Sequence, residues 1–233
     1  MHGLFVTGTD TEVGKSVVAA VLVATLAARG VPVAAFKPAV TGLDDAPEPG
    51  KPHDHELLAA CAGTAPEEVA PFRYGPAVSP HLAAEEAGTT IDPMALVEAA
   101  RRNGGGGRTL IAEGVGGLLV PLTSEGYLVR DLCVELGLPL VVVARPGLGT
   151  INHTLLTLES ARGAGLNVRA VVITPWPPDP TGMQVSNRET IARLGAVEVV
   201  ALGPVAGFAP AQLAAAGAAW PVERWLAEGA AAA

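Results

Sequence analysis

The strongest chemical signal in the sequence is a glycine-bearing stretch near its start, Gly8-Thr-Asp-Thr-Glu-Val-Gly14-Lys15-Ser16. Main-chain N–H groups in such a loop can point at phosphate oxygens, and a helix that begins after the loop adds partial positive charge. Lys15 can reach the terminal phosphates of a nucleotide, and the Ser16 hydroxyl can bind Mg²⁺. The spacing between Gly8 and Gly14 is one residue longer than in the common pattern. We therefore predict a nucleotide phosphate site, a P-loop, between a strand and a helix.

Two more charged residues follow predicted strands. Lys37 comes after Phe36 at the end of the second strand, and Glu113 comes after a strand over residues 109–112. The C-terminal ends of parallel strands line one edge of a sheet, where ligands bind. Lys15 and Lys37 together could stabilise charge on a transferring phosphoryl group, and Glu113 could bind Mg²⁺ beside the P-loop hydroxyl.

Two weaker features carry alternatives. Asp54 stands between His53 and His55, but histidines two residues apart diverge on a helix, so we expect no zinc site. Asp54 itself is expected to cap a helix or to bind magnesium. The segment 147–153 joins a predicted strand to a predicted helix, so its amides could hold an anion, or it could be a plain connecting turn.

These residues need elements to position them, and short apolar runs alternate with helical patterns along the chain. The predicted strands cover residues 4–7, 31–36, 109–112, 140–144, 168–174 and 197–202. The predicted helices cover residues 15–29, from about 54, 93–103 with Asp92 as its cap, 128–136, 152–164 and 186–194, with an Ala-rich helix at the end. Residues 42–52 are expected to be a loop, and four prolines break up residues 63–91. The pattern predicts one α/β domain over residues 1–233, P-loop NTPase-like, with a mostly parallel sheet covered by helices on both faces in three αβα layers.

Composition excludes several partners. The formal net charge is −8 and no cluster of Lys and Arg stands out, so we expect no nucleic acid partner. Cys61 and Cys133 show neither a CxxC pair nor metal-ligand spacing, which suits a reducing cytoplasm. The N-terminus lacks the features of a signal peptide, and the apolar stretch 17–28 is too short to span a bilayer. We expect a cytoplasmic protein with no membrane partner.

Four motifs together resemble one family, dethiobiotin synthetase. They are GTDTEVGKS (8–16), KPAVTG (37–42), EGVGGLLVPL (113–122) and GTINHTLLT (149–157). The order and separation of the motifs match over about residues 1–175, whereas the last sixty residues match loosely. The resemblance implies an ATP-dependent carbon–nitrogen ligase of biotin biosynthesis that uses 7,8-diaminononanoate, CO₂ or bicarbonate, and Mg·ATP. In that reaction a carbamate forms, ATP phosphorylates it to a carbamic-phosphoric anhydride, and the second amine closes the ureido ring.

The resemblance also implies roles for individual residues. Thr11, Lys15 and Lys37 would be catalytic, and Ser16, Asp54 and Glu113 would hold Mg²⁺. The residues implied at the nucleotide are Glu12, Val13, Gly14, Lys15, Ser16, Asp54, Glu113, Gly114, Val115, Gly116, Thr174, Pro175, Gly203, Pro204 and Val205. The residues implied at the diamine are Thr41, Gly149, Thr150 and Asn152, the last three often acting across a homodimer interface.

The chain departs from the family pattern at one position. The family often has an asparagine that reads adenine, where this chain has Thr174 followed by Pro175 and Trp176. The choice of nucleotide is therefore left open.

Two other classes of protein share a P-loop of this kind. One is the partition-type ATPase, a switch, which usually carries a second lysine where this chain has Thr9 and Asp10. The other is the synthetase domain of cobyrinate-type amidotransferases, although this chain is too short to include a glutaminase. ATP turnover with and without the diamine separates the three interpretations.

Overall fold

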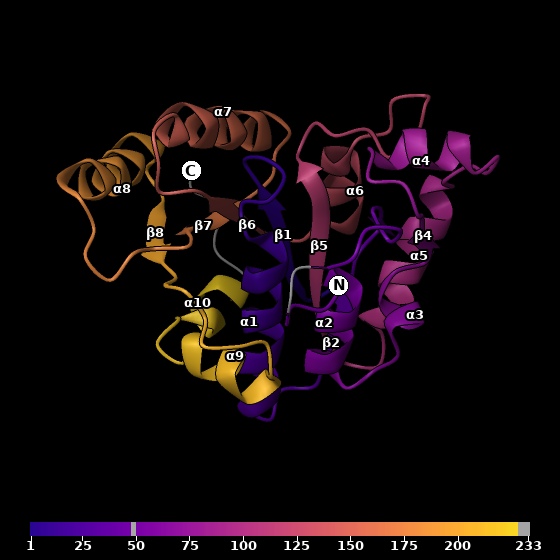
Figure 1. Cartoon of the computed structure of the whole chain (residues 1–233), viewed down its shortest axis with the longest axis horizontal. Helices are drawn as coiled ribbons and strands as arrows, with labels where there is room; N and C mark the ends of the chain where they lie inside the picture. Colours follow the sequence, from indigo (N-terminus) through magenta and orange to yellow (C-terminus); the bar gives the residue numbers. More distant parts are fainter. Residues whose placement is uncertain (48–49, 228–233) are drawn as a thin grey trace.

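A computed structural model describes residues 1–47 and 50–227. Its centre is a six-stranded sheet in the order β2-β5-β1-β6-β7-β8, and each of its strand pairs is parallel (Figure 1). The strands are β1 (Gly3–Gly8), β2 (Val33–Phe36), β5 (Thr109–Gly117), β6 (Leu140–Ala144), β7 (Val168–Ile173) and β8 (Glu198–Ala201). A separate pair joins β3 (Ala39–Val40) to β4 (Phe72–Arg73). The predicted parallel sheet is confirmed.

Helices cover both faces of the sheet, which confirms the predicted three layers (Figure 1). One face packs against α1 (Lys15–Ala28), α2 (Asp54–Ala62), α9 (Pro210–Ala216) and α10 (Val222–Leu226). The other packs against α4 (Pro80–Glu86), α5 (Pro93–Asn103), α6 (Val129–Leu136), α7 (Thr150–Gly163) and α8 (Gly182–Gly195). A short helix, α3 (Pro66–Val69), follows α2. Within the described residues no helix is both long and apolar enough to cross a membrane.

Successive side chains of each strand point to opposite faces of the sheet and pack into a core on each face. In β1, Leu4 and Val6 join the core that contains α1, whereas Phe5 joins the core on the opposite face, as the two-residue period of a strand requires. Helix α1 is buried on nearly all sides because it lies between the sheet, α2 and α9. Its sequence accordingly has no charged residue between Ser16 and Ala28. This burial fixes the start of α1, and with it the P-loop.

One predicted strand boundary is wrong in a way that matters for function. The strand predicted for residues 109–112 continues to Gly117, because β1 pairs with it as far as Gly8 after a shift of register. Glu113 therefore lies within β5, opposite Val6. Pairing with β2 stops one residue earlier, at Ala112. Glu113 nevertheless lies beside the end of β2, because Ala112 pairs with Phe36, the residue before Lys37.

One helix cap and two helix starts also differ from the prediction. Helix α2 does begin at Asp54, but His53 occupies the cap position, so Asp54 is the first helical residue and not the cap. Helix α7 begins two residues before the predicted start, after Gly149. Helix α8 begins at 182, four residues early, because the Thr181 hydroxyl accepts a hydrogen bond from Gln184 N at 3.4 Å and caps it.

The proline-rich stretch 63–91 contains short elements that the sequence pattern did not reveal. Pro66 and Pro80 are the first residues of α3 and α4, a position that suits proline because its missing N–H would have no partner there. An Ala-rich helix was predicted at the end of the chain. The structure has two short helices in this region, α9 and α10, and residues 228–233 lie outside the described residues.

Candidate active site

The loop between β1 and α1 is shaped by two left-handed residues. Gly14 caps α1 with φ 95°, and a Cβ atom on it would lie 2.8 Å from Thr174 Cγ2. Glycine is therefore required at 14 both by conformation and by space. Glu12 has φ 58°, which is uncommon for a residue other than glycine. Lys15 and Ser16 open α1 and are nearly buried, so the first turn of the helix faces the site.

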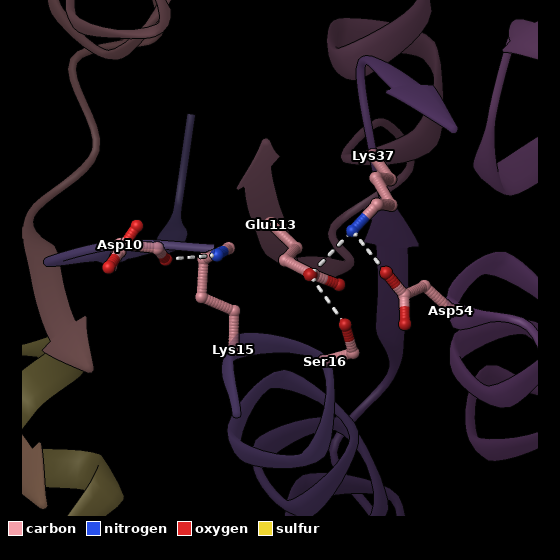
Figure 2. Close-up of polar contacts among 6 residues, drawn as sticks. All are labelled: Asp10, Lys15, Ser16, Lys37, Asp54 and Glu113. Carbon is pink, nitrogen blue, oxygen red and sulfur yellow. Dashed lines mark hydrogen bonds and ion pairs between the residues drawn. The ribbon is translucent and has the colours of Figure 1, made fainter. Parts of the chain in front are cut away.

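Four side chains meet beside this loop, three from α1, α2 and β5 and one from the residue that follows β2 (Figure 2). Glu113 Oε1 accepts hydrogen bonds from Ser16 Oγ at 2.8 Å and from Lys37 Nζ at 2.5 Å. Lys37 Nζ also donates to Asp54 Oδ2 at 2.9 Å. Lys37 is thus shared by two carboxylates, one fully buried and one about one-third exposed. These are the residues that the sequence singled out from separate motifs, and the fold brings them together.

The two lysines have opposite electrostatic environments. Burial lowers the pKa of Lys15 to about 8, and the charge of Lys37 acts in the same direction. For Lys37 burial also acts to lower the pKa, but Asp54 and Glu113 outweigh it and hold the pKa well above its ordinary value. Lys37 therefore stays charged.

The carboxylates also differ from each other. Burial acts to raise the pKa of Asp54, but the ammonium of Lys37 overcomes it and the pKa falls well below its usual range. Burial raises the pKa of Glu113 in spite of the same lysine. Glu113 is fully buried and the neighbouring charge of Asp54 raises its pKa further, whereas the side chain of Asp54 is about one-third exposed.

The donor set fits a magnesium ion bound together with phosphates. Ser16, Asp54 and Glu113 offer hard oxygen ligands, and Glu113 Oε2 is buried without a hydrogen-bond partner among the described residues. In the part of the chain that the structure describes, no group of three His, Cys, Asp or Glu side chains is placed to hold a metal alone. Two carboxylates and a hydroxyl would leave the other coordination positions of Mg²⁺ to phosphate oxygens and water. Mg²⁺ commonly binds with a nucleotide in this way.

A cavity of about 590 Å³ opens at this cluster. It is lined by Thr11, Glu12, Gly14, Lys15, Ser16, Val17, Lys37, Ala39, Val40, Thr41, Lys51, Asp54, Val115 and Gly116. Most residues predicted at the phosphates are in this set, and so is Thr41, predicted at the diamine. Glu113 is not in this set, but it is bonded to two residues that are, Ser16 and Lys37. Val13 and Gly114 point elsewhere: Val13 is buried in the core around α1, and a Cβ on Gly114 would lie 3.0 Å from Phe5 and Val129. Their predicted contact with a nucleotide is left to main-chain atoms.

The residues predicted at the nucleobase lie next to the P-loop. Thr174 follows β7, is buried, and donates its N–H to Ala144 O at 3.0 Å. Trp176 N donates to Leu202 O at 2.7 Å, which brings the segment 203–205 beside Thr174 and Pro175. A base bound next to Gly14 would therefore meet the ends of β7 and β8.

The start of α7 lies apart from this cavity. Gly149 has φ 86° and caps α7, Thr150 is buried with an unpartnered hydroxyl among the described residues, and Asn152 is exposed. None of the three lines the cavity at Lys37. A second cavity of about 520 Å³ lies between residues 8–11 and α7. Within one chain, the possible anion site at the start of α7 and the phosphate site are therefore separate.

Sequence patterns missed two basic residues near the site. Lys51 lines the first cavity but sits in a Pro- and Gly-rich loop, where a lysine carries no signal beyond its closeness in sequence to Asp54. Arg145 Nη2 donates to Asp10 Oδ2 at 2.7 Å. Its position directly after a predicted strand could have indicated a residue at the ligand edge of the sheet.

Solved structures share the fold at low sequence identity. A ParA family ATPase from Chlorobium tepidum TLS matches with a TM-score of 0.51 at 10% identity, over 97% of this chain and 95% of that one. The cell division ATPase MinD of Pyrococcus furiosus matches with a TM-score of 0.53 at 16% identity, over 93% and 98%. At such identities the likeness shows the fold alone and does not favour the partition-type interpretation.

Sequence relatives are more specific. A family model described as an AAA domain matches residues 2–205. The ATP-dependent dethiobiotin synthetase BioD of Anaeromyxobacter sp. (strain Fw109-5) is 41% identical over 213 residues, which are 86% of this chain and 93% of the relative. The protein of the same name from Rhodococcus jostii (strain RHA1) is 39% identical over 230 residues, 97% of each chain. The chain therefore belongs to the family of ATP-dependent dethiobiotin synthetases.

Proposed function

We propose that the protein closes the ureido ring of dethiobiotin from 7,8-diaminononanoate, CO₂ and Mg·ATP. The observation that carries the proposal is that Lys15, Ser16, Lys37 and Asp54 line one cavity in a chain of this family, while Glu113 is bonded to Ser16 and Lys37. The ammonium groups of Lys15 and Lys37 suit a reaction that brings a carbamate anion to a triphosphate.

The first step needs a carbamate. One substrate amine attacks CO₂, forms an N–C bond and loses a proton, which leaves a carbamate anion. Lys37 is the residue suited to bind that anion, because its pKa is held above the ordinary value and it stays charged at every physiological pH. Thr11 and Thr41 line the same cavity and can donate hydroxyl hydrogen bonds to the diamine or carbamate.

The second step transfers phosphate. A carbamate oxygen attacks the γ-phosphorus, the bond to the β-phosphate oxygen breaks, and ADP leaves. Such a transfer requires alignment and charge neutralisation more than covalent chemistry. The main-chain amides of residues 12–16 and the ammonium of Lys15 are suited to hold the triphosphate. Mg²⁺, held by Ser16, Asp54 and Glu113, would neutralise phosphate charge when bound.

The third step closes the ring. The second amine attacks the carbonyl carbon of the carbamic-phosphoric anhydride, the C–O bond to phosphate breaks, and inorganic phosphate departs as the amine loses its proton. No protein nucleophile is needed at any step. Lys37 and Lys15 would stabilise the departing phosphate, since both line the cavity where it forms.

We also propose that the working unit is a homodimer in which the start of α7 binds the substrate's distal carboxylate. Free N–H groups at a helix N-terminus suit an anion. Leu119 and Leu156 are each 56% exposed and line the second cavity together with residues of α7. A second copy that covers them would bury apolar surface beside the P-loop.

Product formation tests the proposed function directly. Purified protein is incubated with diaminononanoate, bicarbonate and Mg·ATP, and dethiobiotin and phosphate are both measured. We expect one phosphate released per dethiobiotin formed, and little ATP hydrolysis without the diamine. Lys15→Ala should fold normally and lose turnover by a factor on the order of 10² or more. Rapid ATP hydrolysis without diamine and without dethiobiotin would contradict the proposal and favour a switch ATPase.

A further inference from the structure

Asp10, in the middle of the phosphate loop, is bonded to three groups. Its Oδ1 accepts a hydrogen bond from Thr11 N at 2.8 Å, and its Oδ2 accepts one from Arg145 Nη2 at 2.7 Å. Its main-chain carbonyl accepts one from Lys15 Nζ at 2.8 Å, which Figure 2 shows on the side of Lys15 away from Lys37. Asp10 therefore connects Arg145 to two residues proposed to act in the reaction.

Arg145 is well placed to hold this loop. It directly follows β6, which pairs with β1 along residues 5–8. Thr9 N donates to Val143 O at 2.9 Å. The end of β6 thus fixes two successive residues of the loop, Thr9 through the main chain and Asp10 through the side chain of Arg145.

The orientation of Asp10 affects both cavities. Lys15 has the Asp10 carbonyl as the hydrogen-bond partner of its ammonium among the described residues, and it lines the first cavity. Thr11 lines the first cavity and the second. A rotation of the peptide between Asp10 and Thr11 would therefore move Lys15 and Thr11 together.

The carboxylate of Asp10 also poses an electrostatic problem. The loop and the start of α1 attract anions, so an unneutralised carboxylate within the loop would repel triphosphate and carbamate. The guanidinium of Arg145 supplies the opposite charge. The two side chains are 50% and 54% exposed, and exposed ion pairs contribute little to stability. The contribution of this pair lies in the site's potential and in the loop's orientation.

We infer that Arg145 is a positioning residue of the ligase: it neutralises Asp10 and holds the loop so that Lys15 and Thr11 face the anionic substrates. The inference rests on the proposed function, and it assigns Arg145 no contact with substrate. Because Arg145 acts through Asp10, a second substitution at Asp10 should reverse the effect of removing Arg145.

The test is the Kd of Mg·ATP, measured by titration at low ionic strength in four proteins: wild type, Arg145→Gln, Arg145→Lys and the double variant Asp10→Asn/Arg145→Gln. Arg145→Gln should weaken binding about tenfold, because one uncompensated charge remains in the loop. Added salt should shrink that difference. Arg145→Lys should retain most of the affinity, since it keeps the charge. The double variant should recover most of it, because asparagine keeps the Oδ1 acceptor for Thr11 N but carries no charge.

A matched control is Arg73→Gln, which removes an ion pair with Glu67 at 3.1 Å whose side chains are 36% and 64% exposed. It should leave the Kd unchanged and shift the melting temperature as little as Arg145→Gln does. A Kd for Arg145→Gln within about twofold of wild type, or a double variant that binds no more tightly than Arg145→Gln, overturns the inference. The Kd is measured without turnover, so a failed dethiobiotin assay would reject the proposed function and leave this test valid.

Discussion

Lys37 differs from Lys15 in that its ammonium is already held by two carboxylates. Such a fixed, permanently charged group can stabilise charge that develops during the reaction without reorganising. We predict that Lys37→Ala lowers kcat by a factor on the order of 10² or more and weakens Mg·ATP binding much less. Steady-state kinetics and nucleotide titration of the same preparation check this.

The control for Lys37→Ala is its fold, because the substitution leaves Asp54 and Glu113 facing each other without the cation. Circular dichroism and a melting curve should show a folded protein before kinetics are compared. A folded Lys37→Ala variant with wild-type kcat would remove Lys37 from the chemistry.

Lys15 offers a prediction about pH. In the free protein burial lowers its pKa from 10.5 to about 8, and a bound triphosphate should raise that pKa again by supplying negative charge. Above pH 8 the free protein is partly deprotonated at Lys15 and the complex is not, so binding should take up a proton at pH 9 and none at pH 6.5. Calorimetric titrations in two buffers with different heats of ionisation measure the uptake. Lys15→Arg, which stays charged, should show none at either pH.

The lowered pKa of Lys15 also determines how stability depends on pH. The unfolded chain binds more protons at Lys15 than the folded one between pH 8 and 10.5, so this group alone makes the free protein more stable as pH rises through that range. In the calorimetric titrations, proton uptake by wild type at pH 6.5 equal to that at pH 9 would show that a group other than Lys15 takes up the proton on nucleotide binding.

Thr174 leads us to predict weak selectivity among the four nucleotides. Asparagine can pair with adenine through a donor and an acceptor, whereas Thr174 has one hydroxyl and Pro175 has no N–H. We predict that CTP, GTP or UTP is used within about tenfold of ATP in kcat/KM, a factor worth roughly 1.4 kcal/mol. The ratio is measured for the four nucleotides at saturating diamine and magnesium. Thr174→Asn should raise the preference for ATP. A wild-type preference above about a thousandfold would mean that other groups, such as those at 203–205, read adenine.

The sequence singles out candidate residues of the site but does not reveal the contacts between them. Lys15 stands out through the Gly-Lys-Ser triplet of the loop, and Lys37 and Glu113 stand out because each was predicted at a strand end, where parallel strands converge. The bond from Arg145 to Asp10 spans 135 positions, and no local pattern encodes it. The pairing of Asp54 with Lys37 was not predicted either, because an aspartate near a helix start is typical of a helix cap.

Among the elements, those with a strong apolar run were predicted best. The strand at 140–144 has the predicted bounds because it is buried along its whole length. Residues 63–91 could not be predicted, because tertiary contacts hold their short elements. Lys37 N donates to Val69 O at 2.9 Å, and Asn103 Nδ2 donates to Glu68 O at 2.8 Å. Neither contact leaves a periodic signal.

The packing of α9 on α1 gives a prediction at this scale. Gly217 ends α9, and a Cβ there would lie 2.2 Å from Thr25 Oγ1 and 2.6 Å from Val21 Cγ1. We predict that Gly217→Ala forces α9 away from α1 and lowers the free energy of unfolding by about 1–3 kcal/mol. Denaturant unfolding measures it. The matched control is Gly163→Ala at the exposed end of α7, where an added Cβ meets nothing within 4 Å. It should be neutral or slightly stabilising, so an equal loss in both variants would contradict a packing effect.

For the whole molecule, charge and shape must be considered together. A net charge of −8 cannot draw in an anionic diamine carboxylate and a triphosphate. Local donors must hold each anion, and in one chain the phosphate cavity and the start of α7 are separate. The proposed homodimer would resolve this separation, because a two-fold axis can bring the start of α7 of one protomer to the cavity of its partner.

Mixed dimers test that arrangement. Lys37→Ala inactivates the phosphate site, and Asn152→Asp places a carboxylate at the start of α7, where it repels the substrate carboxylate but suits a helix N-terminus. Each variant alone should be nearly inactive. If the start of α7 serves the partner's site, then in a mixed dimer one site has both lesions and the other has neither. Equal mixing makes half of the dimers mixed, so about a quarter of wild-type activity should return after subunit exchange. If α7 serves its own chain, each site of the mixed dimer keeps one lesion and no activity returns. A monomer by light scattering would reject the dimer outright.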